Sequence, residues 1–411
     1  MERRRVFVTG IGLVAPHGQD PEDVFERVYA AESAVRLVGS GTGRTGRDAL
    51  LCPVQYDPFE SIPKSQRKFM ARASQMAVVA ATRSLERANL EKGSRSLSEA
   101  GIYLGCSLGG SEVLQNHYER YFSERAKRSR IATTPMIMAN GPASHMSMLF
   151  DVRGPTLTYS VACVSSTLAI GEAFRAIRDG YLDCALTGGA EAQLNTGTVS
   201  GWHELGVLAT EHASGPAASS RPFDSNRTGL VLGEGAALLV LESEQSAQSR
   251  GAEPLAEVVG YGTSSDAYNL TAPHPDGQWR AMSKALVDGE VDASQVGYIN
   301  AHATGTLTGD PAEAAAIKRL LGDAAGDVPV SSTKAVHGHL VGAAGGLEAA
   351  LTVRALQTGR VPPTAHLTDL DPECGLDCVP IHGRAVENLE YALSNSFAFG
   401  GTNATLLFRR V

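Results

Sequence analysis

Short runs of apolar and β-branched residues alternate along the chain with segments whose apolar positions repeat at helical spacing. The strand-like runs are RVFVTGIG, AGIYLGC, TLTYSVAC, CALTGGAEA, GAALLVLE, VGYINAH, VPVSSTK and ATLLFRR. Continuous apolar runs of this kind predict strands that are buried on both faces. Because such strands need helices on both sides, the pattern predicts a layered α/β architecture.

The length of the chain predicts two closely packed halves, since 411 residues exceed what one compact core usually supports. The best division is the polar segment SEQSAQSRGAEP, near residues 245–255, which follows a predicted strand. We therefore expect an N-terminal half over residues 1–250 and a C-terminal half over residues 251–411. No sequence repeat between the halves is visible.

Composition excludes several classes of protein. The net charge is -8 and the basic residues form no long run, which argues against a nucleic-acid-binding protein. The first apolar run ends in Gly and Pro without a cleavage signal, and no stretch approaches the roughly 20 apolar residues of a membrane helix. A soluble, cytoplasmic protein is expected.

The six cysteines are scattered, unlike the dense framework of a small secreted domain, so reduced thiols are expected. Cys374 and Cys378 are four residues apart, but no second Cys/His pair accompanies them. Since a structural zinc site needs about four ligands, we expect no metal there.

Cys163 stands where the strand-like run TLTYSVAC meets the helical pattern LAIGEAFRAIRDG. A helix N-terminus offers unpaired N–H groups and a positive dipole end, which favour thiolate and lower the pKa of a cysteine. The position predicts a nucleophile. A buried structural cysteine is the alternative from this segment alone.

His302 follows the strand-like run VGYIN, in a loop of small residues before a helix opened by Asp310 and Pro311. Ligand chemistry in α/β proteins gathers beyond the carboxyl ends of strands. The position makes His302 a candidate site residue, although a solvated loop histidine is the simpler interpretation of one segment.

A third segment, VPVSSTKAVHGHLVGAAGGLEA, repeats this plan with Lys334 and His339 after a strand. Its helix is rich in Gly and Ala, which costs helix stability, so close packing against another element is expected. Glu348 lies about two and a half turns beyond His339 and is placed to pair with Lys334.

The last segment joins two predicted strands through Phe399, Gly400 and Gly401. A Gly-Gly turn can aim backbone N–H groups at one point, as an oxyanion hole requires, and an ordinary hairpin is the alternative.

Two other patterns suggest no chemistry. Gly10 and Gly12 imitate a dinucleotide fingerprint, but Pro16 and Gly18 interrupt the expected phosphate-binding helix. The stretch ERYFSERAKRSR, residues 119–130, predicts a charged, solvated helix face, with a carrier-protein docking patch as the alternative.

Taken together, these segments resemble the elongating β-ketoacyl-carrier-protein synthases of fatty acid synthesis and their type II polyketide relatives. The resemblance covers essentially the whole chain, through the markers VFVTGIGLVAPHG, DVRGPTLTYSVACVSS, LTGGAEA, SRPFDSNRTGLVLGEGAALLVLE, NAHATGTLTGD, SSTKAVHGHLVGAAGGLEA and NSFAFGGTNATLLF. It implies the thiolase fold, a five-layer α/β/α/β/α stack of two similar halves, usually a homodimer.

The resemblance also implies roles for individual residues. Cys163 matches the acyl-accepting nucleophile, and His302 and His339 match the pair that promotes decarboxylation of the malonyl thioester. Lys334 and Glu348 match a paired lysine and acid beside them. The remaining matches are Phe399, the gate that shares the oxyanion hole with Cys163; Thr304 and Thr306, in the phosphopantetheine channel; Gly400, beside the gate; and Leu108, where the acyl pocket meets the dimer interface.

The implied substrates are carried on the phosphopantetheine of an acyl carrier protein, and no cofactor is implied. Two departures, Ala303 and Ala398 where the family usually has Gly, reduce backbone freedom near the site. The pathway stays open between fatty acid and type II polyketide or polyene synthesis. So does the partner, which is a second copy or a chain-length subunit.

Two other functions compete with this interpretation. Non-catalytic partner subunits resemble the synthases but generally lack the nucleophile, whereas Cys163 is present here. An acyltransferase that uses the acyl-cysteine without decarboxylation is disfavoured because both His302 and His339 are present.

Overall fold

The computed structural model describes residues 3–39, 47–123, 129 and 131–411. Its main feature is a ten-stranded mixed sheet in the order β11-β10-β14-β15-β9-β1-β8-β6-β4-β5. The strands of the N-terminal half are β1 Val6–Val14, β4 Gly101–Gly105, β5 Thr156–Tyr159, β6 Cys184–Glu191 and β8 Gly235–Ser243. Those of the C-terminal half are β9 Ala256–Ser265, β10 Val296–Asn300, β11 Val330–Ser331, β14 Tyr391–Phe397 and β15 Thr402–Arg409.

The two halves of the sheet have the same topology. In each, the five strands taken in chain order are arranged third, second, fourth, fifth, first, and the fifth runs antiparallel to the other four. The halves join where Val6–Val8 of β1 pair with residues 256–258 of β9. This duplication supports the division into residues 1–250 and 251–411, which stays a prediction.

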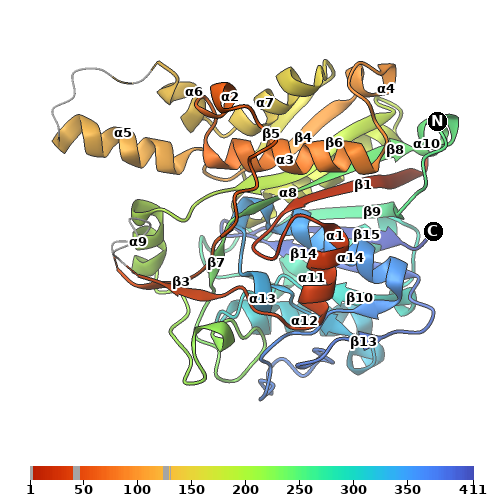
Figure 1. The fold of residues 1–411 in the computed structure, drawn as a ribbon. Coiled ribbons are helices and arrows are strands. Elements are labelled where there is room, and N and C mark those ends of the chain that lie inside the picture. The colour runs from red at the N-terminus through yellow and green to blue at the C-terminus, as the bar shows by residue number, and fades with distance from the viewer. Residues whose placement is uncertain (1–2, 40–46, 124–128, 130) are drawn as a thin grey trace.

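Helices form the other layers (Figure 1). Helices α8 (Ser165–Arg178) and α14 (Ala344–Thr358) pack against each other between the two half-sheets. Helices α3 (Arg72–Arg87) and α7 (Gly141–Phe150) cover the outer face of the N-terminal half. Helices α11 (Pro275–Asp288) and α12 (Gly309–Leu321) cover the outer face of the C-terminal half. The expected α/β/α/β/α thiolase fold is therefore confirmed.

Small residues allow the central helices to approach closely. A Cβ atom added at Gly345 would lie 1.9 Å from Thr167 Oγ1. The N–H of Gly346 donates to Ser166 Oγ at 2.9 Å. The expectation that the Gly- and Ala-rich helix packs tightly against another element is therefore confirmed.

Gly10 and Gly12 also serve helix packing. They lie in β1, and added Cβ atoms would come within 2.2 Å of Ser84 O and 2.0 Å of Ala80 O on α3. These two glycines let a strand and a helix touch through their backbones.

The remaining elements are short connections and edges. The small strands are β2 Arg36–Val38, β3 Ala49–Cys52, β7 Leu232–Gly233, β12 Arg360–Val361 and β13 Arg384–Ala385. The other helices are α1 Pro21–Tyr29, α2 Lys64–Arg67, α4 Arg95–Ser98, α5 Ser111–Ser123, α6 Thr133–Ile137, α9 Thr196–Glu204, α10 Glu244–Ser249 and α13 Lys334–His337. Two 3-10 turns, η2 Ala162–Val164 and η6 Val341–Ala343, precede α8 and α14.

Three sequence expectations concern these peripheral features. Residues 119–123 are exposed on α5, as expected for a solvated face, while residues 124–128 and 130 lie outside the described residues. All six cysteines are buried and unpaired. Among the described residues, no helix has the length and apolarity to cross a membrane.

Candidate active site

Cys163 lies in the turn η2, between β5 and α8, as the sequence predicted. The turn is tight, because Ala162 has a φ of 47°, which L-residues rarely adopt. The Ser165 hydroxyl accepts the N–H of Val161 at 2.9 Å and donates to the carbonyl of Ala162 at 2.7 Å. These bonds hold the strained turn. The cysteine within it is 5% exposed.

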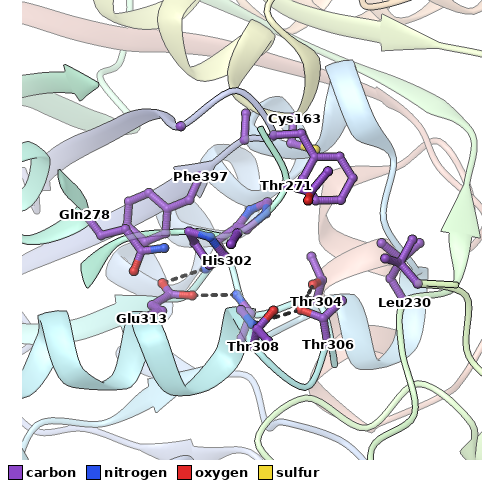
Figure 2. Close-up of a pocket in the computed structure, with 18 of the residues that line it drawn as sticks. Cys163, Leu230, Thr271, Gln278, His302, Thr304, Thr306, Thr308, Glu313 and Phe397 are labelled. Atoms are coloured by element: carbon purple, nitrogen blue, oxygen red, sulfur yellow. Dashed lines mark hydrogen bonds between the residues drawn. The ribbon is translucent and has the colours of Figure 1, made fainter. Parts of the chain in front are cut away.

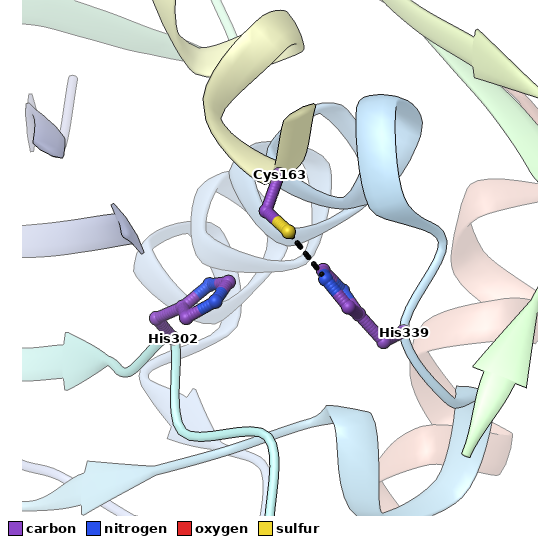
Figure 3. A group of neighbouring side chains, drawn as sticks. All are labelled: Cys163, His302 and His339. Atoms are coloured by element: carbon purple, nitrogen blue, oxygen red, sulfur yellow. Dashed lines mark hydrogen bonds between the residues drawn. The ribbon is translucent and has the colours of Figure 1, made fainter. Parts of the chain in front are cut away.

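Two histidines from the C-terminal half face this cysteine. His302 follows β10 directly, and His339 follows α13. The N–H of His339 donates to the carbonyl of Val231, the residue before β7, and the carbonyl of His339 accepts an N–H of β7. His339 Nε2 lies 2.9 Å from Cys163 Sγ (Figure 3). The two imidazole rings are 5.3 Å apart and nearly perpendicular. Three residues predicted separately therefore form one buried cluster.

The protonation of this cluster differs from the sequence expectation. Burial raises the pKa of the Cys163 thiol to about 12, and the charge of Lys334 and the backbone N–H of Phe399 offset only part of that rise. Burial lowers the pKa values of His302 and His339 well below the usual range, and the positive charge of Lys334 is the second largest cause. The expectation of a lowered cysteine pKa was wrong, because desolvation of the buried thiol is the largest influence on its pKa and raises it. The resting cluster is a neutral thiol beside two neutral imidazoles.

Lys334 and Glu348 form an ion pair beside the cluster, and both side chains are almost fully buried. Burial raises the pKa of Glu348, and Lys334 opposes that rise. His337 points elsewhere, since its Nε2 bonds to Thr333 Oγ1 at 2.9 Å. The pairing expected from the sequence is therefore present.

The carboxylate of Glu313 accepts a hydrogen bond from the backbone of His302 (Figure 2). Its carboxylate accepts the N–H groups of His302 at 2.9 Å and Ala303 at 2.7 Å, and the amide of Asn395 at 3.1 Å. Burial raises the pKa of Glu313 to about 7. The sequence analysis missed this residue; its signal was an acid at the start of the helix after the His302 loop.

A second acid holds the loop that carries Thr304 and Thr306. Asp310 accepts the N–H groups of Gly305 at 3.1 Å and Phe223 at 2.8 Å, and burial raises its pKa to about 6. Arg227 donates to the carbonyl of Thr306 at 3.0 Å. The two threonine hydroxyls lie 3.2 Å apart.

The cluster opens into a pocket, which Cys163, His302 and His339 all line. Thr304 and Thr306 line this pocket, as do Ala303 and Ala398. Its wall also includes Phe399, whose ring stacks on that of Trp202 with the centroids 5.8 Å apart. The sequence analysis missed Trp202, which lies on α9 far from every recognised motif.

Two predicted substrate-binding residues lie outside the lining of this pocket. Leu108 is about half exposed, in the segment after β4. Gly400 is exposed, and its N–H donates to the carbonyl of Leu270 at 2.7 Å. Gly400 and Gly401 have φ values of 87° and 74°, which glycine adopts readily, and the neighbouring N–H of Phe399 hydrogen-bonds to the cysteine sulfur.

A buried cysteine that faces two histidines, at the junction of two duplicated halves, defines an acyl-transferring enzyme of the thiolase fold. The family profile "Beta-ketoacyl synthase, N-terminal domain" matches residues 3–247, and "Beta-ketoacyl synthase, C-terminal domain" matches residues 255–368. The chain therefore belongs to the β-ketoacyl synthase family, whose members are condensing enzymes.

Individual relatives match along their whole length. Nodulation protein E of Rhizobium leguminosarum bv. trifolii is 38% identical over 99% of this chain and 100% of its own. The 3-oxoacyl-[acyl-carrier-protein] synthase 2 of Vibrio cholerae is 37% identical over 100% of both. Among solved structures, the ishigamide ketosynthase/chain length factor matches with a TM-score of 0.90 and 31% identity over 100% of both chains.

Proposed function

We propose that this chain is a β-ketoacyl-acyl-carrier-protein synthase that loads an acyl group onto Cys163 and extends it by two carbons from malonyl-carrier protein. The contact of 2.9 Å between His339 Nε2 and Cys163 Sγ, with His302 facing both, is the observation that supports this most. The name of the Vibrio cholerae relative supports the carrier protein as the source of substrate.

The first step is acyl transfer. The sulfur of Cys163 attacks the carrier thioester and gives its proton to His339, because a thiol with a pKa of about 12 needs a base at this distance. The N–H groups of Cys163 and Phe399 stabilise the oxyanion. The carrier sulfur then leaves and takes the proton from His339, which returns to its neutral form.

The second step is decarboxylative condensation. The malonyl carboxylate leaves as carbon dioxide, and the electron pair of the broken bond forms an enolate on the thioester. Neutral His302 and His339 each have one N–H to donate to the enolate oxygen. The enolate carbon attacks the acyl group on Cys163, the C–S bond breaks, and the sulfur leaves as a thiolate, which takes a proton from solvent to restore the neutral thiol.

This sequence of steps consumes no cofactor. Lys334 lies close enough to influence the charge of the cluster, and its ion pair with Glu348 fixes its position. We assign Thr304 and Thr306 to the phosphopantetheine arm, because their hydroxyls line the pocket that leads to Cys163.

We also propose that the chain forms a dimer through the edge of its sheet. The strand β5 ends the ten-stranded order, and Leu157 on it is 45% exposed. Two other exposed apolar side chains are Met148 on α7, a helix that packs against β5, and Met138 in the segment before α7. An unpaired edge strand with apolar neighbours favours pairing with another chain.

A second copy of this chain is the partner we expect, and Leu157→Asp tests it. The wild type should run as a dimer and the variant as a monomer in size-exclusion chromatography with light scattering. A monomeric wild type would overturn the homodimer and direct attention to a heterodimer, as in the ishigamide ketosynthase/chain length factor relative.

Intact-mass analysis tests the reaction. Purified protein is incubated with acyl-carrier proteins of several chain lengths and then with malonyl-carrier protein, beside Cys163→Ala. We expect an acyl adduct on the wild type only, discharged into a carrier product two carbons longer. No adduct from any carrier would contradict the proposal and favour a non-catalytic subunit. An adduct that malonyl-carrier does not discharge would favour a simple acyltransferase.

A further inference from the structure

Glu191, the last residue of β6, is fully buried. Its carboxylate accepts the N–H of Ser107 at 2.7 Å and that of Leu108 at 3.4 Å, both in the segment after β4. The N–H of Gly342, in the turn η6 of the other half, also donates to it. Among the described residues, none forms an ion pair with Glu191.

The Gly342 contact is close. A Cβ atom added to Gly342 would lie 2.5 Å from Glu191 Oε2 and 2.7 Å from the nitrogen of Ser107. Val341, the preceding residue, has a φ of 47°, which is strained for a β-branched side chain. The turn is therefore held in an unfavourable conformation with its N–H directed at the carboxylate.

The turn η6 matters because of its neighbours. It begins two residues after His339, and it packs against η2, which carries Cys163. Val341 belongs to the same apolar cluster as Cys163. On the other side, the carbonyl of Ser107 accepts the hydroxyl of Ser160, three residues before the cysteine, at 2.9 Å.

The burial of this carboxylate is costly for the fold. Burial raises the pKa of Glu191 to about 7, which shows that its backbone donors do not fully replace water. An apolar residue of the same volume would avoid this cost. What the carboxylate adds is one rigid acceptor shared by backbone donors from both halves.

We propose that Glu191 is a positioning residue that fixes the turn bearing Cys163 relative to the turn that follows His339. The inference rests on the proposed acyl-transfer function of Cys163. Without the carboxylate, the backbone donors of Ser107 and Gly342 lose their common acceptor, and the contact between His339 Nε2 and Cys163 Sγ lengthens. Glu191 does not line the pocket that opens from the cluster.

Glu191→Gln tests the proposal, because an amide keeps the volume but offers only one oxygen and turns donors toward the backbone N–H groups. We expect the single-turnover rate of acyl loading onto Cys163 to fall about tenfold, the size that one lost charged hydrogen bond predicts. The final extent of loading should match the wild type, since the protein is folded and only the geometry has changed. A purely structural role would lower the extent and leave the rate unchanged.

Glu242→Gln is the matched control. Glu242 is equally buried in the N-terminal half, on β8, where it accepts the hydroxyl of Thr9 at 2.6 Å and pairs with Arg250. It should lose stability but load at the wild-type rate. Wild-type loading by Glu191→Gln, or equal slowing by both variants, would overturn the inference.

Gly342→Ala and alkylation of Cys163 cover the other outcomes. If Glu191→Gln does not fold, Gly342→Ala disturbs the same contact from the other half and should slow loading similarly; unchanged loading would overturn the inference.

If the wild type loads no acyl group, the proposed function fails, and the rate of Cys163 alkylation by iodoacetamide then reports on the geometry of the site alone. Glu191→Gln should be alkylated at Cys163 about tenfold more slowly, as the lost contact with the His339 base predicts, and an unchanged alkylation rate would overturn the inference.

Discussion

At the scale of the residue, burial decides how Cys163 and its histidines are protonated. Burial raises the pKa of the thiol and lowers those of His302 and His339, so all three are neutral at rest. Neutrality suits both proposed steps, because one imidazole nitrogen can accept the thiol proton while an N–H can later face the enolate. A permanent thiolate would instead hold His339 as an imidazolium and remove the base.

Glu313 leads to a prediction about the pH dependence of stability. Its folded pKa of about 7 lies above its usual value of 4.5, so between these pH values the folded state holds a proton that the unfolded state has released. Glu313 therefore lowers the free energy of unfolding as pH rises through this range. Glu313→Gln lacks this effect. As the pH rises from 4.5 to 7, the free energy of unfolding of the variant should therefore increase by up to roughly 3 kcal/mol relative to that of the wild type.

Urea denaturation of Glu313→Gln and the wild type at pH 5, 6, 7 and 8 measures this difference. The variant also loses one of the two backbone hydrogen bonds from His302 and Ala303, because an amide has a single oxygen, so its absolute stability is lower at acid pH. Only the change with pH bears on the burial of the charge. A constant difference between the two proteins at all four pH values would contradict the prediction.

The sequence predicted the members of the cluster but not their support. Cys163, His302 and His339 stood out because each follows a strand and precedes a helix, and the family resemblance joined them. Glu191 and Glu313 gave no comparable signal, since a buried acid that accepts backbone N–H groups looks like any acid near a helix. The pKa of Cys163 could not be predicted, because the sequence shows the helix dipole but not the depth of burial.

At the scale of the element, the contact between α8 and α14 sets the distance between the two halves. Gly345 faces Thr167 at this crossing, where the threonine hydroxyl bonds to Ser396 Oγ at 2.7 Å. The turns that carry Cys163 and precede α14 rest on the N-terminal ends of the same two helices. Spreading the helices would therefore separate the catalytic side chains as well.

Gly345→Ala should destabilise the protein by about 2 kcal/mol, because its methyl group would overlap Thr167 Oγ1 and the core is too dense to absorb it. Thr167→Ala removes the overlapping atom. The loss of unfolding free energy in the double variant should be about 1 kcal/mol smaller than the sum of the losses in the two single variants, as expected for residues in contact. Chemical denaturation of the four proteins measures this coupling, and strict additivity would show that the crossing has room.

Element prediction succeeded where the pattern was local. All eight apolar runs form strands, because continuous burial leaves a clear signal. The long strand β9 was not predicted, since AEVVGYGTSS mixes small and polar residues and lies directly after the polar boundary segment. Its pairing with β1 is a contact between halves, which no local pattern reports.

At the scale of the whole molecule, one apolar cluster joins the two halves. It contains Ile170 and Phe174 from α8 together with Leu347 and Leu351 from α14, all nearly or fully buried. In the part of the chain that the structure describes, only the short β1–β9 pairing connects the half-sheets directly. Each half therefore leaves the inner face of its central helix uncovered unless the other half is present.

Separate expression of residues 1–250 and 251–411 tests this dependence together with the predicted boundary. Each fragment alone should be insoluble or lack cooperative unfolding, because the exposed inner helix face is a large apolar patch. Coexpressed, the two fragments should copurify and load an acyl group onto Cys163, since the cut falls in the polar segment between α10 and β9 and leaves every layer intact. A matched pair cut within α8 should not complement, because that cut destroys a central helix. Cooperative thermal unfolding of either fragment alone would show that the halves fold independently, and failure of coexpressed fragments to associate would place the boundary elsewhere.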